Sequence, residues 1–300
     1  MTTTATVHAG LKVSRIGLGC VTFGREIDEP AAHAMLDHGF ASGMIFLDTA
    51  SAYGGGASER VLGSWLASRR PGAGEFTLAT KLLPPFTGNR IAETIEQSLE
   101  RLGVPAIDLL YLHTWDASAE STDSLAALDA LVRSGGVRTI GASNFTAVQL
   151  ARALDAQERH GLARFQFVQN NQNLAVSDVT PELRELCAAR GVAIVTYSPL
   201  GAGFLTGKHS NGVAPGSRFD VIPGHQQVYF HERAQRRLAR LEAVAARTGH
   251  SKAHLALAWA LHQPGVASVL VGGRTPAHLD QALAAQAFDE PAIFAELTAD

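Results

Sequence analysis

The sequence has few cysteines, no long apolar run and no block of like charges. Only Cys20 and Cys187 occur among its 300 residues, too few for a disulfide framework or a zinc pattern, so we expect a reducing cytoplasm. A net charge of −3 without a basic tract argues against a nucleic-acid partner. No apolar run approaches the roughly 18 residues of a membrane span, and the start lacks signal-peptide features. We therefore expect neither membrane insertion nor secretion.

Metal-binding and nucleophile patterns are also missing. The twelve histidines include no His-Glu-x-x-His arrangement, so no metal site is predicted. No arrangement of the Ser-His-Asp kind is recognisable either. Hydrolytic chemistry of these kinds is not expected.

What the chain does contain is a regular alternation of short apolar runs with amphipathic segments. A hairpin over Val7 to Val13, turning at Ala9-Gly10, comes first. Eight predicted strands follow, at Ile16 to Gly19, Met44 to Asp48, Phe76 to Lys81, Ile107 to His113, Val137 to Ser143, Phe165 to Gln169, Val192 to Tyr197 and Val266 to Val271. Helices are predicted between and after them, at Pro30 to Ser42, Ser58 to Ala67, Asn89 to Leu102, Thr122 to Ser134, Thr146 to His160, Thr180 to Arg190, Ser251 to His262 and Thr275 to Ala287.

This order predicts an α/β fold, a single (β/α)8 TIM barrel that spans residues 1–300. Uninterrupted βα alternation implies a parallel sheet, and eight units in ~250 residues are typical of a closed barrel. The barrel would carry the N-terminal hairpin and an extra helix, Glu232 to Arg247, after its seventh strand. The alternative is an open doubly wound sheet, which would need a Gly-x-Gly-x-x-Gly turn that Gly17-Leu18-Gly19-Cys20-Val21-Thr22 does not supply. A glycine- and proline-rich loop, Ser198 to about His225, is long enough to suggest a function.

Polar residues gather where the predicted strands end. The carboxyl ends of barrel strands share one face, which is where such barrels keep their chemistry. Four ionisable residue types at successive strand ends are hard to explain by packing alone. The polar residues at or just after these ends are Asp48, Tyr53, Lys81, His113, Ser143, Asn144, Gln169, Tyr197, Ser198 and Arg274.

These residue types suit proton transfer to a carbonyl oxygen. A lysine ammonium close to a phenol favours the phenolate, so Lys81 is expected to lower the pKa of Tyr53 from its usual ~10. Asp48 would neutralise Lys81, because buried charges are costly unless paired. His113, neutral or charged, would orient the carbonyl from the other side. Since none of these groups supplies a hydride, a cofactor must.

Several motifs together resemble the aldo-keto reductases, the NAD(P)H-dependent barrel family, over most of the chain. The resemblance implies a catalytic tetrad of Asp48, Tyr53, Lys81 and His113, with Tyr53 as proton donor, and reversible reduction of aldehydes or ketones to alcohols. The motifs are Leu47-Asp48-Thr49-Ala50 with Tyr53-Gly54, Thr80-Lys81, Tyr111-Leu112-His113, Gly141-Ala142-Ser143-Asn144-Phe145, Tyr197-Ser198-Pro199-Leu200-Gly201 and Leu205-Thr206-Gly207-Lys208.

The same resemblance implies residues that bind the cofactor. Ser143, Asn144 and Gln169 match positions that bond the nicotinamide carboxamide, and Tyr197 matches the aromatic residue that stacks on its ring. Arg274 favours NADPH over NADH, because it could pair with a 2′-phosphate. The remaining candidates are Cys20, Val21 and Asp48 near the cofactor, Ser198, Leu200, Gly201, Lys208 and Arg218 over the pyrophosphate, and Gly272, His278 and Gln281 toward the adenosine.

The adenosine end departs from the family pattern, because glutamate and asparagine are missing where Gln281 and Ala282 stand. Phe23, Phe86 and Trp115 are candidates for the substrate pocket, and Gln172 for its rim. Two other functions are compatible with the sequence: an NADP(H)-binding regulatory subunit of the channel-β type, and a lyase that forms a Schiff base on Lys81. A small carbonyl compound is the expected partner, but its identity and the oligomeric state are not predicted.

Overall fold

The computed structural model describes residues 1–70, 72, 74–210 and 212–299, so Asn211 of the expected long loop and Asp300 lie outside it. Within these residues the centre of the molecule is a closed, all-parallel barrel of eight strands in the order β10-β3-β4-β5-β6-β7-β8-β9, which confirms the predicted fold. The strands are β3 (Ile16–Gly19), β4 (Phe46–Asp48), β5 (Thr77–Leu82), β6 (Ile107–Leu112), β7 (Val137–Ser143), β8 (Phe165–Asn171), β9 (Ala193–Tyr197) and β10 (Val266–Val271).

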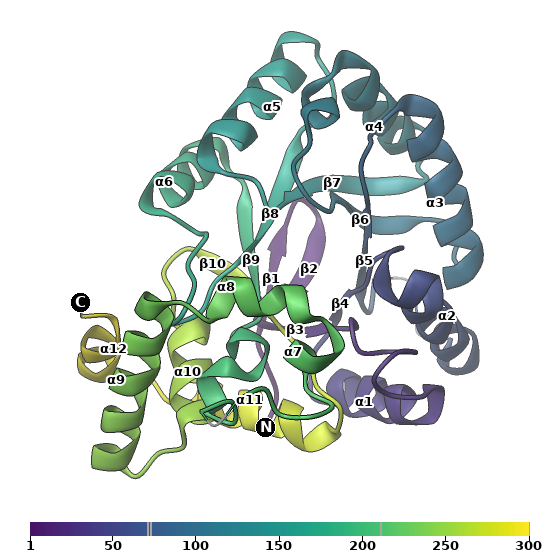
Figure 1. The fold of residues 1–300 in the computed structure, drawn as a ribbon. Coiled ribbons are helices and arrows are strands. Elements are labelled where there is room, and N and C mark those ends of the chain that lie inside the picture. Colours follow the sequence, from purple (N-terminus) through teal and green to yellow (C-terminus); the bar gives the residue numbers. More distant parts are fainter. Residues whose placement is uncertain (71, 73, 211, 300) are drawn as a thin grey trace.

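Helices surround the barrel on its outside (Figure 1). Capping residues set where several of them begin and end. For example, Thr180 caps α6 at Leu183 N, Pro181 is its first residue, and Gly191 ends it with φ 65°, as the sequence predicts. The surrounding helices are α1 (Glu29–Ala41), α2 (Ala57–Arg69), α3 (Gly88–Leu102), α4 (Thr122–Ser134), α5 (Ala147–Arg159), α6 (Pro181–Arg190), α10 (Lys252–Leu261) and α11 (Pro276–Gln286).

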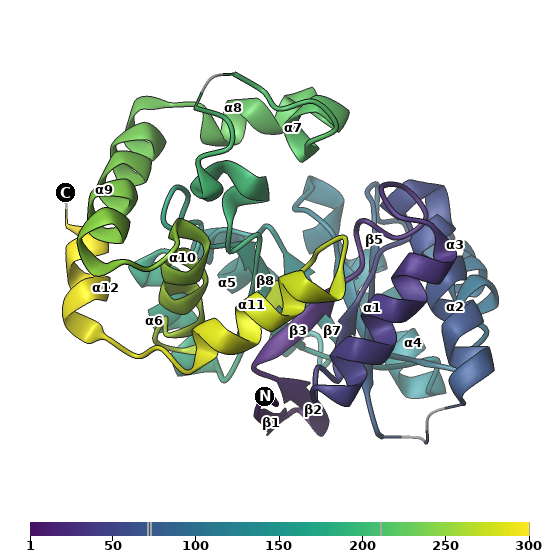
Figure 2. The ribbon, with the colours of Figure 1, turned by 90° about the horizontal axis from the view of Figure 1, so that it is seen from below.

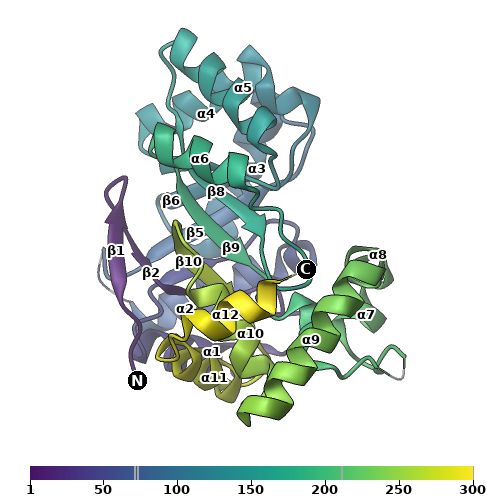
Figure 3. The same cartoon turned by 90° about the vertical axis from the view of Figure 1, so that its left-hand side faces the viewer.

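An N-terminal hairpin covers one end of the barrel. Its strands β1 (Ala5–His8) and β2 (Leu11–Ser14) are joined at Ala9-Gly10, where both residues have positive φ (47° and 76°), the conformation that tight hairpin turns require. Leu11 and Val13 are buried against side chains inside the barrel. Figures 2 and 3 show the hairpin at the opposite end from α7 (Arg218–Val221) and α8 (Gln226–Tyr229). The carboxyl ends of the strands therefore stay available for a site.

The segment after β9 is more ordered than the sequence predicts. We call residues 198–210 and 212–231 the β9–α9 segment. It contains the short helices η3 (Gly201–Thr206), α7, η4 (Pro223–His225) and α8 before the extra helix α9 (Glu232–Thr248). Aromatic rings hold these turns together, with Phe219 and Phe230 edge to face at 5.0 Å and Phe204 stacked on Tyr229 at 6.3 Å. Helices this short show no helical periodicity in the sequence, which is why the sequence predicts a loop here.

A last helix, α12 (Pro291–Thr298), is absent from the sequence prediction. It packs on α9, where Arg247 pairs with Glu296, and Figures 1 and 3 show the two helices side by side. Among the described residues, no helix is both long and apolar enough to span a membrane.

Candidate active site

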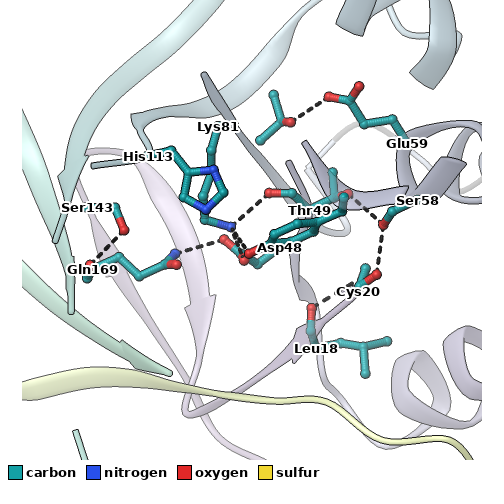
Figure 4. Close-up of polar contacts among 12 residues, drawn as sticks. Leu18, Cys20, Asp48, Thr49, Ser58, Glu59, Lys81, His113, Ser143 and Gln169 are labelled. Atoms are coloured by element: carbon teal, nitrogen blue, oxygen red, sulfur yellow. Dashed lines mark hydrogen bonds and ion pairs between the residues drawn. The ribbon is translucent and has the colours of Figure 1, made fainter. Parts of the chain in front are cut away.

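Lys81 lies at the centre of the polar residues at the carboxyl end of the barrel. It is on β5 and fully buried. Its Nζ atom donates to Asp48 Oδ1, to the carbonyl oxygen of Thr49 at 2.8 Å and to the hydroxyl oxygen of Tyr53 at 3.2 Å. Figure 4 shows this ammonium between Asp48 and Thr49. Three acceptors around one cation satisfy a charge that would otherwise be costly to bury.

The turn after β4 brings Tyr53 to Lys81. Asp48 ends the strand, and Tyr53 begins the one-turn helix η1 (Tyr53–Gly56). Gly54, Gly55 and Gly56 all have positive φ (58°, 60° and 87°), a backbone path that residues with a Cβ rarely follow. The three glycines therefore turn the chain back into α2 while the tyrosine side chain stays at the lysine.

Gln169, near the end of β8, contacts the same ion pair. Its Nε2 donates to the second carboxylate oxygen of Asp48, Oδ2, at 2.8 Å (Figure 4). Burial raises the pKa of Asp48, and Lys81 and Gln169 oppose this without fully cancelling it. Burial lowers the pKa of Lys81, but Asp48 and Tyr53 raise it by more. Lys81 is therefore an ammonium ion, held by Asp48.

The pKa of Tyr53 differs from the sequence prediction. Lys81 does lower it, and the ammonium also lies 4.9 Å from the centre of the phenol ring. Burial raises the pKa by more, however, so the net shift is upward and the predicted fall is wrong. The sequence indicates the nearby cation, but it does not show how deeply Tyr53 is buried. In the protein as described, Tyr53 is a protonated phenol with a cation at its oxygen.

His113 follows β6 and faces Tyr53. The two rings meet edge to face, with centroids 5.6 Å apart and planes at 76°. Burial, and then the charge of Lys81, lower the pKa of His113 to about 3. The imidazole is therefore neutral at ordinary pH, which resolves the alternatives that the sequence left open.

The residues expected around the nicotinamide gather beside this group and bond to one another. Ser143 Oγ donates to the carbonyl oxygen of Gln169 at 2.9 Å. Asn144 Nδ2 donates to the carbonyl oxygen of His113 at 2.8 Å, and the Tyr197 hydroxyl donates to Asn144 Oδ1 at 2.6 Å. The strand ends after β6, β7, β8 and β9 are thus joined by side chains.

Two cations and a buried hydroxyl provide a fit for phosphate. Burial and the nearby charge of Arg274 lower the pKa of Lys208, so two like charges approach each other here. Arg274 donates to the carbonyl oxygen of Gly216 at 2.7 Å, and the neighbouring Ser217 has a buried hydroxyl without a partner among the described residues. An anion with several oxygens would satisfy all three side chains. The residues present therefore suit a phosphorylated cofactor.

Two residues predicted at the cofactor have other partners. Arg218 donates to Glu26 at 2.9 Å, and Arg25 also pairs with Glu26, so the contact joins α7 to the loop after β3. His278 caps α11, where its Nδ1 contacts Thr275 Oγ1 at 3.0 Å. Neither Glu26 nor Ser217 has a sequence signal that would have marked it.

The other predicted cofactor positions range from fully buried to exposed. The thiol of Cys20 is fully buried, and burial raises its pKa, so this residue can offer only its backbone. The remaining cofactor candidates divide into the partly buried Val21, Ser198 and Leu200, the buried Gly201, and the exposed Gly272 and Gln281.

The substrate-pocket candidates differ in burial. Phe23 and Phe86 are 0% and 1% exposed and pack in the hydrophobic core cluster. Trp115 is partly buried, and its Nε1 donates to Glu120 at 2.9 Å. Gln172 is also buried, and its Oε1 accepts from Ser177 Oγ at 2.7 Å.

Comparison with known proteins agrees with this geometry. A family model described as "Aldo/keto reductase family" matches residues 15–292. The chain is 33% identical to "Protein tas" of Escherichia coli (strain K12), over 89% of this chain and 88% of that protein. It is 31% identical to "Norsolorinic acid reductase B" of Aspergillus parasiticus, over 97% and 79%, and 28% identical to "Probable voltage-gated potassium channel subunit beta" of Arabidopsis thaliana, over 91% and 87%.

Members of the matched family are oxidoreductases that use nicotinamide cofactors. The match covers nearly the whole barrel, and the barrel carries Asp48, Tyr53, Lys81 and His113 in contact at its carboxyl end. The chain belongs to the aldo/keto reductase family.

Proposed function

We propose that the protein reduces aldehyde or ketone carbonyls to alcohols, reversibly, with NADPH. The observation that carries this proposal is the position of Lys81, whose ammonium bonds both Asp48 and the hydroxyl oxygen of Tyr53. Such a cation stabilises the phenolate that proton donation leaves behind. In the cytoplasm, where we expect it, the protein would act on small molecules and not on nucleic acid or membranes.

Tyr53 is the proposed general acid. Its hydroxyl proton moves to the oxygen of the carbonyl as that oxygen becomes an alkoxide, and Lys81 stabilises the resulting phenolate. His113, being neutral, keeps an N–H that can donate to the same oxygen without adding charge. In the reverse direction the Tyr53 phenolate takes the proton from the alcohol.

Residues at the strand ends would hold the dinucleotide, which supplies the hydride when bound. Ser143, Asn144 and Gln169 would bond the carboxamide, and Tyr197 would stack on the ring. Lys208, Arg274 and Ser217 would bind the phosphates. The pair of cations favours NADPH over NADH, because the 2′-phosphate adds negative charge.

The test is turnover on a panel of aldehydes and ketones, followed by the loss of NADPH absorbance. Tyr53→Phe should keep cofactor binding and lose turnover by on the order of 10²–10⁴-fold, the usual size of a general-acid contribution. Tyr229→Phe is the matched control, because its hydroxyl bonds Asn171 and not Lys81. If Tyr53→Phe turns over like the wild type, the assigned role of Tyr53 is wrong.

A second candidate is a cofactor-binding regulatory subunit, favoured by the similarity to the channel subunit named above. It predicts that the protein binds NADPH, seen as a fluorescence change, but that no carbonyl compound oxidises it. A Schiff base on Lys81 is less compatible with the structure, because the raised pKa keeps this amine protonated and therefore not nucleophilic. Borohydride trapping of a carbonyl compound on Lys81 would support the lyase instead.

A further inference from the structure

The hydrogen bonds of His113 come from its main chain, whereas its ring packs on Tyr53. Its N–H donates to the carbonyl oxygen of Leu82 at 2.8 Å, and its carbonyl oxygen accepts from Asn144 Nδ2 at 2.8 Å. The ring atom Nδ1 is buried and has no hydrogen-bond partner among the described residues. A catalytic histidine is usually oriented by a bond to its second nitrogen. Within the part of the chain that the structure describes, that bond is missing, so the orientation of the ring depends on its packing on Tyr53 and on how the peptide is fixed.

Asn144 is itself fixed from several directions. It has φ 59°, a left-handed conformation that asparagine adopts more readily than most residues with a Cβ. Its N–H donates to the carbonyl oxygen of Gln169 at 3.0 Å, and its Nδ2 also reaches Ser143 Oγ at 3.2 Å. An uncommon conformation of this kind persists only where the surroundings over-determine it.

The remaining atom of the Asn144 side chain is bound by Tyr197. Oδ1 accepts from the Tyr197 hydroxyl at 2.6 Å. The carbonyl oxygen of His113 can only accept, so the end of the amide that faces it is Nδ2. A phenol without this acceptor would be an unsatisfied donor, since burial also raises the pKa of Tyr197 and keeps it protonated. The three residues thus form one chain of hydrogen bonds from β9 to the end of β6.

We propose that Asn144 and the hydroxyl of Tyr197 are positioning residues that hold His113 in the orientation needed beside Tyr53. The proposal rests on the proposed function, and it gives Tyr197 two separate tasks. Its ring stacks on the nicotinamide, whereas its hydroxyl orients Asn144. The residues that hold the cofactor and the residue that orients the carbonyl are therefore coupled through one amide.

Removal of the hydroxyl separates the two tasks. Tyr197→Phe keeps the ring that would stack on the nicotinamide, and hydride transfer is measured at saturating NADPH, so that a change in cofactor affinity does not enter the rate. The single-turnover rate of hydride transfer should fall by between about tenfold and a hundredfold, because small misplacements of a catalytic group cost that much. A wild-type rate in Tyr197→Phe would overturn the proposal.

A double-variant test separates positioning from general damage. Asn144→Gly tolerates the left-handed backbone and removes the amide, so it should slow hydride transfer at least as much as Tyr197→Phe. The variant with both changes should be no slower than Asn144→Gly alone, because both act through one chain of bonds. Multiplied losses would show independent roles and contradict the proposal. Tyr229→Phe is the matched control, because it loses another phenol–asparagine bond, to Asn171 at 3.1 Å, and should leave the rate near wild type.

A readout without turnover keeps this inference distinct from the proposed function. NMR relaxation of ¹³C-labelled histidine rings, with the His113 signal assigned by its loss in His113→Gln, reports ring order in the free protein. We expect an ordered ring in the wild type and a more mobile ring in Tyr197→Phe. An equally ordered ring in both would refute the positioning role even if no substrate were found, whereas an inactive wild type would refute only the proposed function.

Discussion

Asp48→Asn removes the counter-ion of Lys81 with almost no change of volume. Both side chains are almost fully buried, at 2% and 0% exposed, so the ammonium left behind cannot reach water. The new amide cannot satisfy both neighbours. If its oxygen faces Lys81, its Nδ2 faces Gln169 Nε2, and two donors then meet where a carboxylate now accepts from each.

The expected loss of stability follows from the burial. Breaking a buried ion pair by removing one partner costs about 3–5 kcal/mol. At this chain length about 2 °C of melting temperature is lost per kcal/mol, so the melting point should fall by roughly 6–10 °C. Asp155→Asn is the control, because Asp155 pairs with Arg190 at the surface with 52% of its side chain exposed. Such a surface pair contributes about 0–1 kcal/mol.

Urea unfolding of four proteins tests the reasoning: the wild type, Asp48→Asn, Lys81→Met and the double variant. Removing both charges leaves no unpaired ion, so the double variant should lose less stability than the two single losses combined. The coupling should be about 0.5–3 kcal/mol. Additive losses, or a single loss as small as that of Asp155→Asn, would show that Asp48 and Lys81 are not a coupled buried pair.

Three other changes test other parts of the site. The pKa of His113 is lowered from 6.5 to about 3, so its contribution to stability is present above pH 6.5 and is lost as the pH falls toward 3. Between pH 6.5 and pH 3, the free energy of unfolding in urea should therefore fall less for His113→Gln than for the wild type. Arg274→Ala should weaken NADPH binding by about fivefold to tenfold, while binding of NADH, which lacks the 2′-phosphate, should change less in fluorescence titration. Equal losses would contradict the assignment of Arg274 to the 2′-phosphate. Glu26→Gln leaves Arg218 and Arg25 without their carboxylate, so NADPH should dissociate faster in stopped-flow measurements. An unchanged dissociation rate would mean that the contact between α7 and the loop after β3 does not retain the cofactor.

The sequence predicts the barrel well because apolar runs and helix caps are local signals. Every barrel strand lies within a few residues of its prediction, and the turn at Ala9-Gly10 is where the sequence puts it. The sequence does not predict the short helices α7 and α8 or the helix α12. The first two owe their order to packing among Phe204, Phe219, Tyr229 and Phe230, which come together only in the folded chain.

The candidate site divides in the same way. Residue types at strand ends suffice to bring Asp48, Tyr53, Lys81 and His113 together, because parallel strands share one carboxyl edge. The balance between burial and charge at Tyr53 is not readable from spacing, and neither is the choice of Glu26 as the partner of Arg218. The burial of the pocket candidates Phe23 and Phe86 in the hydrophobic core cluster is equally unreadable from the sequence.

The central claim is that the ammonium of Lys81 makes the phenol of Tyr53 able to transfer its proton. The pH dependence of alcohol oxidation in Lys81→Met tests it most directly, because in this direction Tyr53 must first be a phenolate. Lys81 lowers the pKa of Tyr53 by more than Asp48 raises it, so without Lys81 the rate should be lower and its rise should move to higher pH. A rise at the wild-type pH in Lys81→Met would contradict the account.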